Sequence, residues 1–246
     1  MWIPSYHRQP VTIIPRKKTI FSPELRIPSA VKEIDEVLGG FQAGALSWIS
    51  GTSPTINILS YALCVNTYEA FHGDTVFIDG GCTMNPYRIA QYARQKEQPA
   101  REVLDHVHVS RAFTVYQLST LIMDELEQVV QQYHPQTVII NAFPTLYLDP
   151  DVSSDEASTL IQQHLTEIKR ITKTYQLVTV VLFSWSSQKQ QHYEICKRVE
   201  QDADESLALH HMNQRTRIQF LTQGTIATMT SQVYGQLSLQ DFGMVI

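Results

Sequence analysis

Short apolar runs rich in β-branched residues recur along this chain and alternate with segments whose apolar residues repeat every three or four positions. Near-continuous apolar character is typical of strands buried on both faces, and strands that alternate with helices build parallel sheets. The pattern therefore predicts an α/β fold, with a mostly parallel twisted sheet and helices on both of its faces. The runs that we interpret as strands are residues 45–51, 75–79, 106–110, 136–141 and 177–184.

Three further segments have clear local patterns. Residues 114–133 and 153–175 carry the helical repeat, and the second opens with the capping-box spacing of Ser153-Ser-Asp-Glu156. Residues 215–230 alternate between apolar and polar side chains on either side of Gln223-Gly224. A glycine turn between two alternating runs predicts a C-terminal antiparallel β-hairpin, which we place at an edge of the sheet.

Charge divides the chain into two parts. Residues 1–28 contain five lysines and arginines but one glutamate, although the whole chain has a net charge of -5. An acidic body excludes a protein that coats nucleic acid or a membrane surface as a whole. A chain of 246 residues is long enough for one large domain. We therefore expect a basic N-terminal arm or linker over residues 1–28 and one core domain over residues 29–246.

The cysteines bear on metal binding and on the cellular compartment. Cys64, Cys82 and Cys196 form no paired motif and are odd in number. This spacing favours neither a disulfide framework nor a zinc module. No stretch approaches the roughly 18 consecutive apolar residues of a membrane helix. We expect no metal, no membrane contact and a cytoplasmic location, or a nuclear one in a eukaryotic host.

Two segments carry a family resemblance. Residues 27–51 read IPSAVKEIDEVLGGFQAGALSWISG, and residues 76–89 read VFIDGGCTMNPYRI. They resemble the RecA, RadA and KaiC group of recombinase ATPases, in the P-loop NTPase superfamily. In that group, a helix followed by glycines precedes the strand and the phosphate loop, and the second strand runs into an "IDTEGxFxPxRI" turn. The resemblance covers roughly residues 27–230 in element order and implies a RecA-like core.

The departures from the family pattern concern the residues that bind and hydrolyse ATP. The family's phosphate loop needs a lysine for the phosphates and a hydroxyl for magnesium. This chain reads GTSPTINI over residues 51–58 and places Ile56 or Asn57 at the lysine position. The magnesium-binding acid of the Walker B strand corresponds to Asn141, and the glutamate that activates water corresponds to Gly81. The resemblance therefore implies a pseudo-ATPase with degenerate Walker motifs.

We accordingly predict no catalytic residue and no required cofactor, with weak ATP or ADP binding left open. For Asp79, a role in fixing the turn that follows its strand is the alternative to a ligand role. The hydroxyls after the first strand fit helix capping as well as anion binding. His210-His211 lacks ligand partners at metal-binding spacing, so we interpret it as part of an edge strand. The residues of the degenerate nucleotide site are Gly51, Thr52, Ser53, Thr55, Asn57, Asp79 and Asn141.

Two segments that contain cations are candidates for contact with DNA or a protein partner. Residues 185–205 follow the fifth strand, where the resembled recombinases have a DNA-binding loop, but their acidic residues favour a solvated loop. The arm resembles the recombinase segment that adds as a strand to a neighbouring subunit through a phenylalanine anchor. A plain edge strand on its own core remains the alternative. The candidate contact residues are Arg16, Lys17, Lys18, Phe21, Lys189, Tyr193, Lys197 and Arg198.

Together these features predict a non-hydrolysing accessory or scaffold protein in DNA recombination and repair. The resemblance implies that it acts with a homologous RecA-type recombinase subunit or with itself, with single-stranded DNA as a further partner. Two alternatives remain open. One is a KaiC-like or recombinase-like ATPase with an unconventional phosphate loop, and the other is a regulatory protein-interaction module that does not bind DNA.

Overall fold

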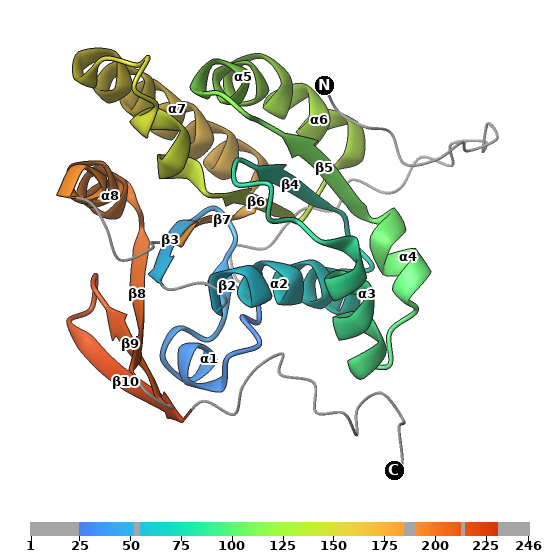
Figure 1. Ribbon diagram of the computed structural model, residues 1–246. Helices are drawn as coiled ribbons and strands as arrows, with labels where there is room; N and C mark the ends of the chain where they lie inside the picture. The colour runs from blue at the N-terminus through green and yellow to red at the C-terminus, as the bar shows by residue number, and fades with distance from the viewer. Residues whose placement is uncertain (1–24, 52–54, 185–189, 213–214, 231–246) are drawn as a thin grey trace, which may run out of the picture.

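The computed structural model describes residues 25–51, 55–184, 190–212 and 215–230 (Figure 1). Its centre is an eight-stranded sheet with the order β10-β9-β8-β3-β7-β6-β4-β5. The strands from β5 to β8 in this order run parallel, and β9 and β10 are antiparallel additions at one edge. The strands are β3 (Leu46–Gly51), β4 (Thr75–Asp79), β5 (Val107–Arg111), β6 (Thr137–Asn141), β7 (Val178–Ser184), β8 (Glu205–Met212), β9 (Arg215–Phe220) and β10 (Thr225–Thr230).

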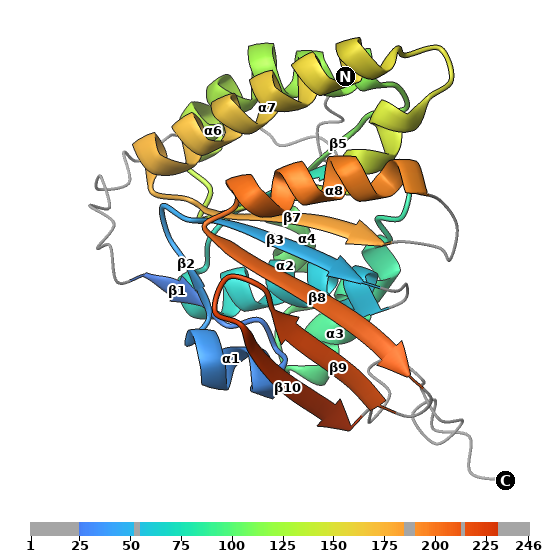
Figure 2. The same cartoon turned by 90° about the vertical axis from the view of Figure 1, so that its left-hand side faces the viewer.

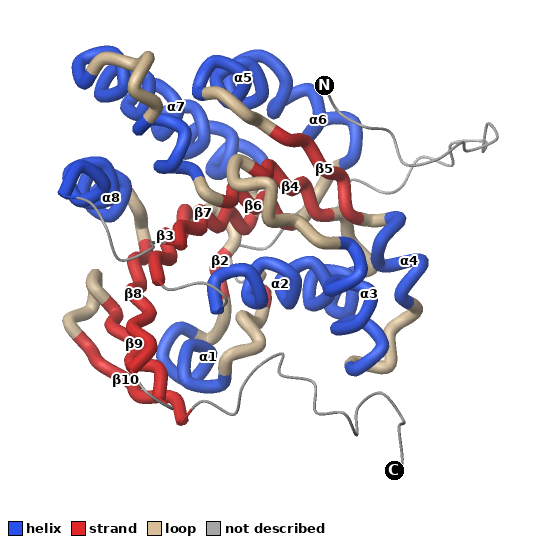
Figure 3. The backbone as a smooth tube through the Cα atoms, viewed as in Figure 1, coloured by secondary structure: helices blue, strands red, loops and turns tan. Residues whose placement is uncertain are grey.

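Helices cover both faces of this sheet (Figure 3). On one side lie α1 (Lys32–Leu38), α2 (Thr55–Phe71), α3 (Pro86–Gln95) and α4 (Ala100–Asp105). On the other lie α5 (Val115–Thr120), the π-helical turn η1 (Leu121–Glu125), α6 (Leu126–Tyr133), the 3₁₀ turn η2 (Phe143–Leu148), α7 (Ser154–Tyr175) and α8 (Gln190–Asp202). No helix in the described ranges has the length and apolar character needed to cross a membrane.

Alternate residues of the central strands pack into two separate cores. In β4, Phe77 packs with the core under α1–α4, whereas Val76 and Ile78 pack with the core under α5–α8. Successive side chains of a strand point to opposite faces, so a strand covered on both sides is apolar at most of its positions. This requirement explains the continuous apolar runs of the sequence and confirms the predicted α/β, RecA-like architecture.

The five predicted strands are confirmed as β3, β4, β5, β6 and β7, each within one residue of its expected bounds. The C-terminal hairpin is confirmed as β9 and β10, and β10 is the last strand of the sheet. Gly224 adopts a φ of 68° in the turn between them, a conformation that glycine accepts without strain. Outside the main sheet, β1 (Arg26–Ile27) pairs with β2 (Phe41–Gln42), so the last residues of the expected arm form a short strand.

Both predicted helices form, with one interruption. The segment 114–133 is divided by η1, a π-helical turn between α5 and α6. In the segment 153–175, the Ser153 side chain accepts a hydrogen bond from the Glu156 amide at 3.2 Å, as a capping box requires. The Glu156 carboxylate instead accepts a hydrogen bond from the Tyr116 hydroxyl, at 3.0 Å. The cap is therefore one-sided, and Glu156 links α7 to α5.

Two expectations were wrong. The segment 185–205, expected as a solvated loop, contains α8 from residue 190 to 202. Val199 is fully buried in the core under α5–α8, so this helix is held by packing that its many charges do not reveal. The strand that contains His210 and His211 is not at an edge, because β8 lies between β3 and β9 (Figure 2). Its second neighbour is the returning hairpin strand, which sequence distance alone does not show.

Candidate functional site

The carboxyl ends of the parallel strands meet at one edge of the sheet, where ligands of open α/β sheets bind. The register places Asp79 beside Arg111 on β5 and beside Asn141 on β6. Gly51 ends β3 opposite Ser184 of β7. The predicted residues Gly51, Asp79 and Asn141 therefore lie at the same edge, and Asp79 is the one acid among the residues that end β3 to β7.

Gly51 is required by close packing against β8. A Cβ atom at this position would lie 2.8 Å from the Leu209 Cβ and 2.9 Å from the Leu209 carbonyl oxygen. Real Cβ atoms do not approach other atoms this closely, so β8 sets the identity of Gly51. Thr52 and Ser53 lie outside the described residues, as does the side chain of Thr55, the first residue of α2. Their predicted roles therefore stay predictions.

The first turn of α2 contains both candidates for the missing lysine. Ile56 is fully buried in the core under α1–α4. Asn57 is half-buried, and its carbonyl oxygen accepts a hydrogen bond from the Ser60 hydroxyl at 2.7 Å. One position is thus a core residue and the other a neutral amide. Neither supplies the positive charge that contacts the β and γ phosphates in a phosphate loop.

Asp79 is fully buried, and its carboxylate holds the turn that follows β4. It accepts hydrogen bonds from the amides of Gly81 at 3.3 Å, Thr83 at 3.1 Å and Met84 at 3.0 Å. The Arg111 guanidinium lies 3.2 Å from the same carboxylate and supplies its counter-charge. These contacts match the turn-fixing interpretation of Asp79 and occupy its oxygens with protein donors.

Asn141 ties the end of β6 to the same turn. Its amide nitrogen donates a hydrogen bond to the Thr83 hydroxyl, and its side-chain oxygen accepts one from the Ala142 amide at 3.0 Å. Its carbonyl oxygen also accepts a bond from the Gly80 amide at 2.9 Å. A neutral side chain at this place contributes no charge to a metal ion, and its polar atoms are engaged within the protein.

The position expected for a water-activating glutamate has little room for any side chain. A Cβ at Gly81 would lie 2.8 Å from the Ala142 Cβ. Ala142 itself adopts a left-handed conformation with a φ of 58°, which brings the start of η2 against the turn. The turn after β4 is therefore packed onto the end of β6. We call the hydrogen-bonded set of Asp79, Thr83, Arg111 and Asn141 the closed edge network.

Two members of this network were missed by sequence reasoning. Arg111 lies one residue beyond the predicted end of its strand, and Thr83 lies in the turn itself. Tyr61 supports them from α2, because its hydroxyl donates to the Thr83 carbonyl oxygen at 2.6 Å. Burial, and next the charge of Asp79, raise the pKa of Tyr61. The only sequence signal for Arg111 was a cation that directly follows an apolar strand.

The predicted DNA or partner residues are only partly described. Lys197 and Arg198 are exposed on α8, and Arg198 donates a hydrogen bond to the Ser158 hydroxyl of α7. Tyr193 lies within α8, but its side chain is outside the described residues. The positions that lie wholly outside the described residues are Arg16, Lys17, Lys18, Phe21 and Lys189.

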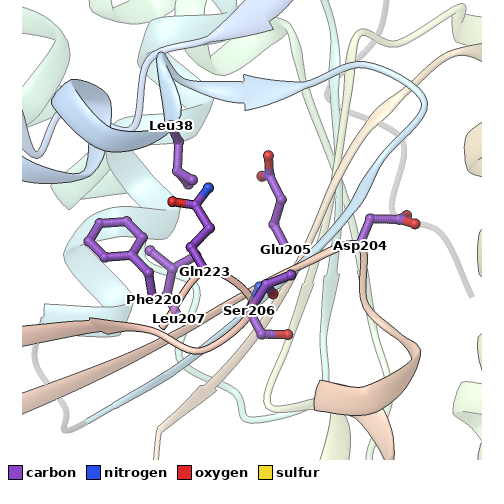
Figure 4. A pocket seen from close by; sticks show the side chains of 8 residues that line it. Leu38, Asp204, Glu205, Ser206, Leu207, Phe220 and Gln223 are labelled. Atoms are coloured by element: carbon purple, nitrogen blue, oxygen red, sulfur yellow. The ribbon is translucent and has the colours of Figure 1, made fainter. Parts of the chain in front are cut away.

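A small pocket lies at the opposite, amino-terminal edge of the sheet (Figure 4). It is bounded by α1, the start of β8 and the turn between β9 and β10. The Glu205 carboxylate at its wall accepts a hydrogen bond from the Ser47 hydroxyl at 2.9 Å, and burial raises the pKa of Glu205. This pocket is separate from the carboxyl edge, and none of the predicted site residues that the structure describes lines it.

Comparison with known proteins agrees with the fold. A family model described as Rad51 matches residues 21–228 of the chain. A DNA repair protein RAD51 homolog from Solanum lycopersicum is 26% identical over 153 residues, which cover 59% of this chain and 44% of that protein. The chain thus spans less than half the length of this curated relative.

Proposed function

Because the chain belongs to the Rad51 family, we propose that it is a non-hydrolysing accessory or scaffold protein in DNA recombination or repair. The observation that carries this proposal is the closed edge network. At the place where an ATPase of this family would hold magnesium and the γ-phosphate, this chain has a buried Asp79 paired with a partly exposed Arg111, and a neutral Asn141. Family membership supports a role in DNA recombination or repair, and the closed edge network supports the loss of ATP hydrolysis.

Hydrolysis of ATP depends on side chains at three places where this chain has none that fits the role. The phosphates need a cation, the metal needs an acidic ligand, and the attacking water needs a base or an orienting group. The corresponding positions carry Ile56 or Asn57, Asn141 and Gly81. Substitution of Gly81 by glutamate would also force the turn away from Ala142. The structure of this edge therefore favours a scaffold over an enzyme.

The two ends of the sheet support a role in association. In the described residues, β5 and β10 each pair with a single strand, so the described part of the chain supplies neither with a second neighbouring strand. A strand with free amides and carbonyls can accept an additional strand from a partner. We propose that the partner is a homologous RecA-type subunit or a second copy of this chain. Phe21 and the adjoining basic residues are the segment that we propose for this contact.

ATP turnover tests the loss of hydrolysis. Phosphate release is measured with the full chain in magnesium and ATP, with and without single-stranded DNA. We expect no turnover above the buffer blank, and no change in Asn57→Ala or Asn141→Ala. Magnesium-dependent turnover that either substitution abolishes would refute the proposal and would favour an ATPase with an unconventional phosphate loop.

Association and DNA binding are tested separately. Analytical ultracentrifugation of the chain alone, and mixed with an active recombinase of its host, should detect a self-assembly or a mixed complex. A strictly monomeric chain that forms no complex would contradict the scaffold role. Anisotropy of a labelled single-stranded oligonucleotide should show binding that is independent of ATP and weakens with salt. No binding under any condition would favour the regulatory module that does not contact DNA.

A further inference from the structure

The helical layer formed by α5 to α7 has a single sign of charge along most of its length. No lysine or arginine occurs between Arg111 and Lys169, and this stretch contains eight aspartates and glutamates. It forms α5, η1, α6, β6, η2 and the greater part of α7. A stretch of this length without any cation disfavours phosphate-rich ligands, because like charges repel, although Arg198 of α8 donates a hydrogen bond to Ser158 within this layer.

Exposed aromatic rings lie within this acidic layer. Phe113 is 62% exposed and Tyr116 is 51% exposed, at the start of α5. The Tyr116 hydroxyl donates its hydrogen bond to Glu156 in the first turn of α7. That hydrogen bond raises the pKa of Tyr116, and the negative charges of Asp149 and Asp151 raise it further. These five residues define what we call the acidic aromatic surface.

The acids of this surface have no cationic partner within the described part of the chain. Asp149, Asp151 and Glu156 form no ion pair there, although Glu127 and Glu167 of the same layer are both paired with Arg170. An acid in the first turn of a helix is favourable in itself, which accounts for Glu156. Asp149 and Asp151 precede the helix cap, so the helix dipole does not account for them, although the Asp149 side chain accepts a hydrogen bond from the Asp151 amide at 3.0 Å.

We propose that the acidic aromatic surface docks a basic, apolar peptide segment of a partner protein. An arginine side chain can stack on an exposed ring and donate paired hydrogen bonds to a neighbouring carboxylate. Phe113 and Tyr116 offer the rings, and the three acids that raise the pKa of Tyr116 offer the carboxylates. Apolar residues of the same segment would cover the remaining ring surface. Complementary charge would also speed the encounter and exclude acidic partners.

This inference rests on the proposed scaffold role and names the kind of partner segment that the scaffold would bind. It does not depend on the absence of ATP hydrolysis. Its test is the anisotropy of a labelled octapeptide of alternating arginine and leucine, titrated with the full chain at low and physiological salt. The reference peptides replace every arginine by glutamate, or every leucine by serine. We expect the arginine–leucine peptide to bind most tightly, and the glutamate peptide not to bind.

Variants locate the binding on the surface. Tyr116→Ala and the pair Asp151→Asn with Glu156→Gln should each weaken binding about two- to fivefold per altered group, as exposed ring and charge contacts do. The matched controls are Tyr87→Ala, which removes an 83% exposed ring on α3, and Glu97→Gln, which removes an exposed acid beyond α3. Both controls should bind the peptide as the unaltered chain does.

Three outcomes would overturn the inference. In the first, the surface variants bind the arginine–leucine peptide as tightly as the unaltered chain does. In the second, the chain binds the glutamate peptide. In the third, Tyr116→Ala loses affinity for the oligonucleotide. The third would assign the surface to nucleic acid instead of a basic peptide. None of the substituted residues belongs to the closed edge network, so the peptide assay and the ATP turnover assay can fail independently.

Discussion

His164 on α7 and Tyr147 on η2 form a hydrogen-bonded pair inside the core under α5–α8. The imidazole is fully buried and the tyrosine is 2% exposed, with 2.5 Å between the Tyr147 hydroxyl and the His164 Nδ1. Burial lowers the pKa of His164 from 6.5 to about 4, because the core disfavours the charged ring. The pair thus makes the stability of this layer depend on pH.

The direction and size of that dependence follow from proton linkage. Between pH 6.5 and 4 the unfolded chain binds a proton at His164 that the folded chain excludes, so stability is lost as the pH falls through this window. One pKa unit corresponds to 1.36 kcal/mol, so His164 lowers the free energy of unfolding by about 2 kcal/mol between pH 7 and pH 5. This is a large share of the roughly 5–15 kcal/mol that stabilises a typical domain.

The variant His164→Gln tests this linkage. Glutamine can retain a hydrogen bond with Tyr147 but does not titrate, so the free energy of unfolding should fall about 2 kcal/mol less between pH 7 and pH 5 than in the unaltered chain. Urea unfolding followed by tryptophan fluorescence at pH 5, 6 and 7 measures the difference. Burial raises the pKa of Glu200 and Glu205, but these contributions are common to both chains and cancel.

The control variant Tyr147→Phe removes the hydroxyl and keeps the imidazole. It should lower stability by about 1 kcal/mol through loss of the hydrogen bond, and it should keep the steep pH dependence. If His164→Gln shows the same pH dependence as the unaltered chain, burial of this imidazole does not govern the acid sensitivity, and the reasoning is refuted.

Three further predictions concern the carboxyl edge and the thiols. Arg111→Met leaves the buried carboxylate of Asp79 without its counter-charge and should cost about 1–3 kcal/mol in urea unfolding. The exposed control Arg88→Met should stay within about 0.5 kcal/mol, and equal effects would contradict this role of the ion pair. Gly81→Ala introduces a 2.8 Å contact and should cost about 1–3 kcal/mol by the same assay, whereas an unchanged midpoint would mean that the turn can move freely. Iodoacetamide should modify the exposed Cys82 first and leave Cys64 intact in the folded chain, because Cys64 is buried and burial raises its pKa. Peptide mass spectrometry measures the order of modification, and modification of Cys64 before Cys82 would contradict the prediction.

Much of the fold was predictable because the relevant signals are local. A strand that is buried on both faces needs a mostly apolar sequence, and β6 and β7 have one. The capping serine of α7 and the glycine turn of the hairpin are likewise readable within a few residues. The prediction failed for α8, whose polar sequence does not reveal that Val199 is fully buried in the core.

For the candidate site, the sequence predicted only which catalytic side chains of the family are missing. The absence of a lysine near Gly51, of an acid at Asn141 and of a glutamate at Gly81 is visible in the sequence. What took their place was not visible. Arg111 becomes the partner of Asp79 only because β5 lies next to β4 in the sheet.

The sequence by itself determined the alternation of strands and helices, the family resemblance and the missing charges of the phosphate site. The tertiary structure decided that the edge is closed, since Thr83 meets Asn141 across 58 residues of chain and Gly81 packs against Ala142. It also decided that Tyr116, Asp149 and Glu156 share one surface. Contacts of this kind depend on strand order, register and helix packing, which bring together residues that no local pattern connects.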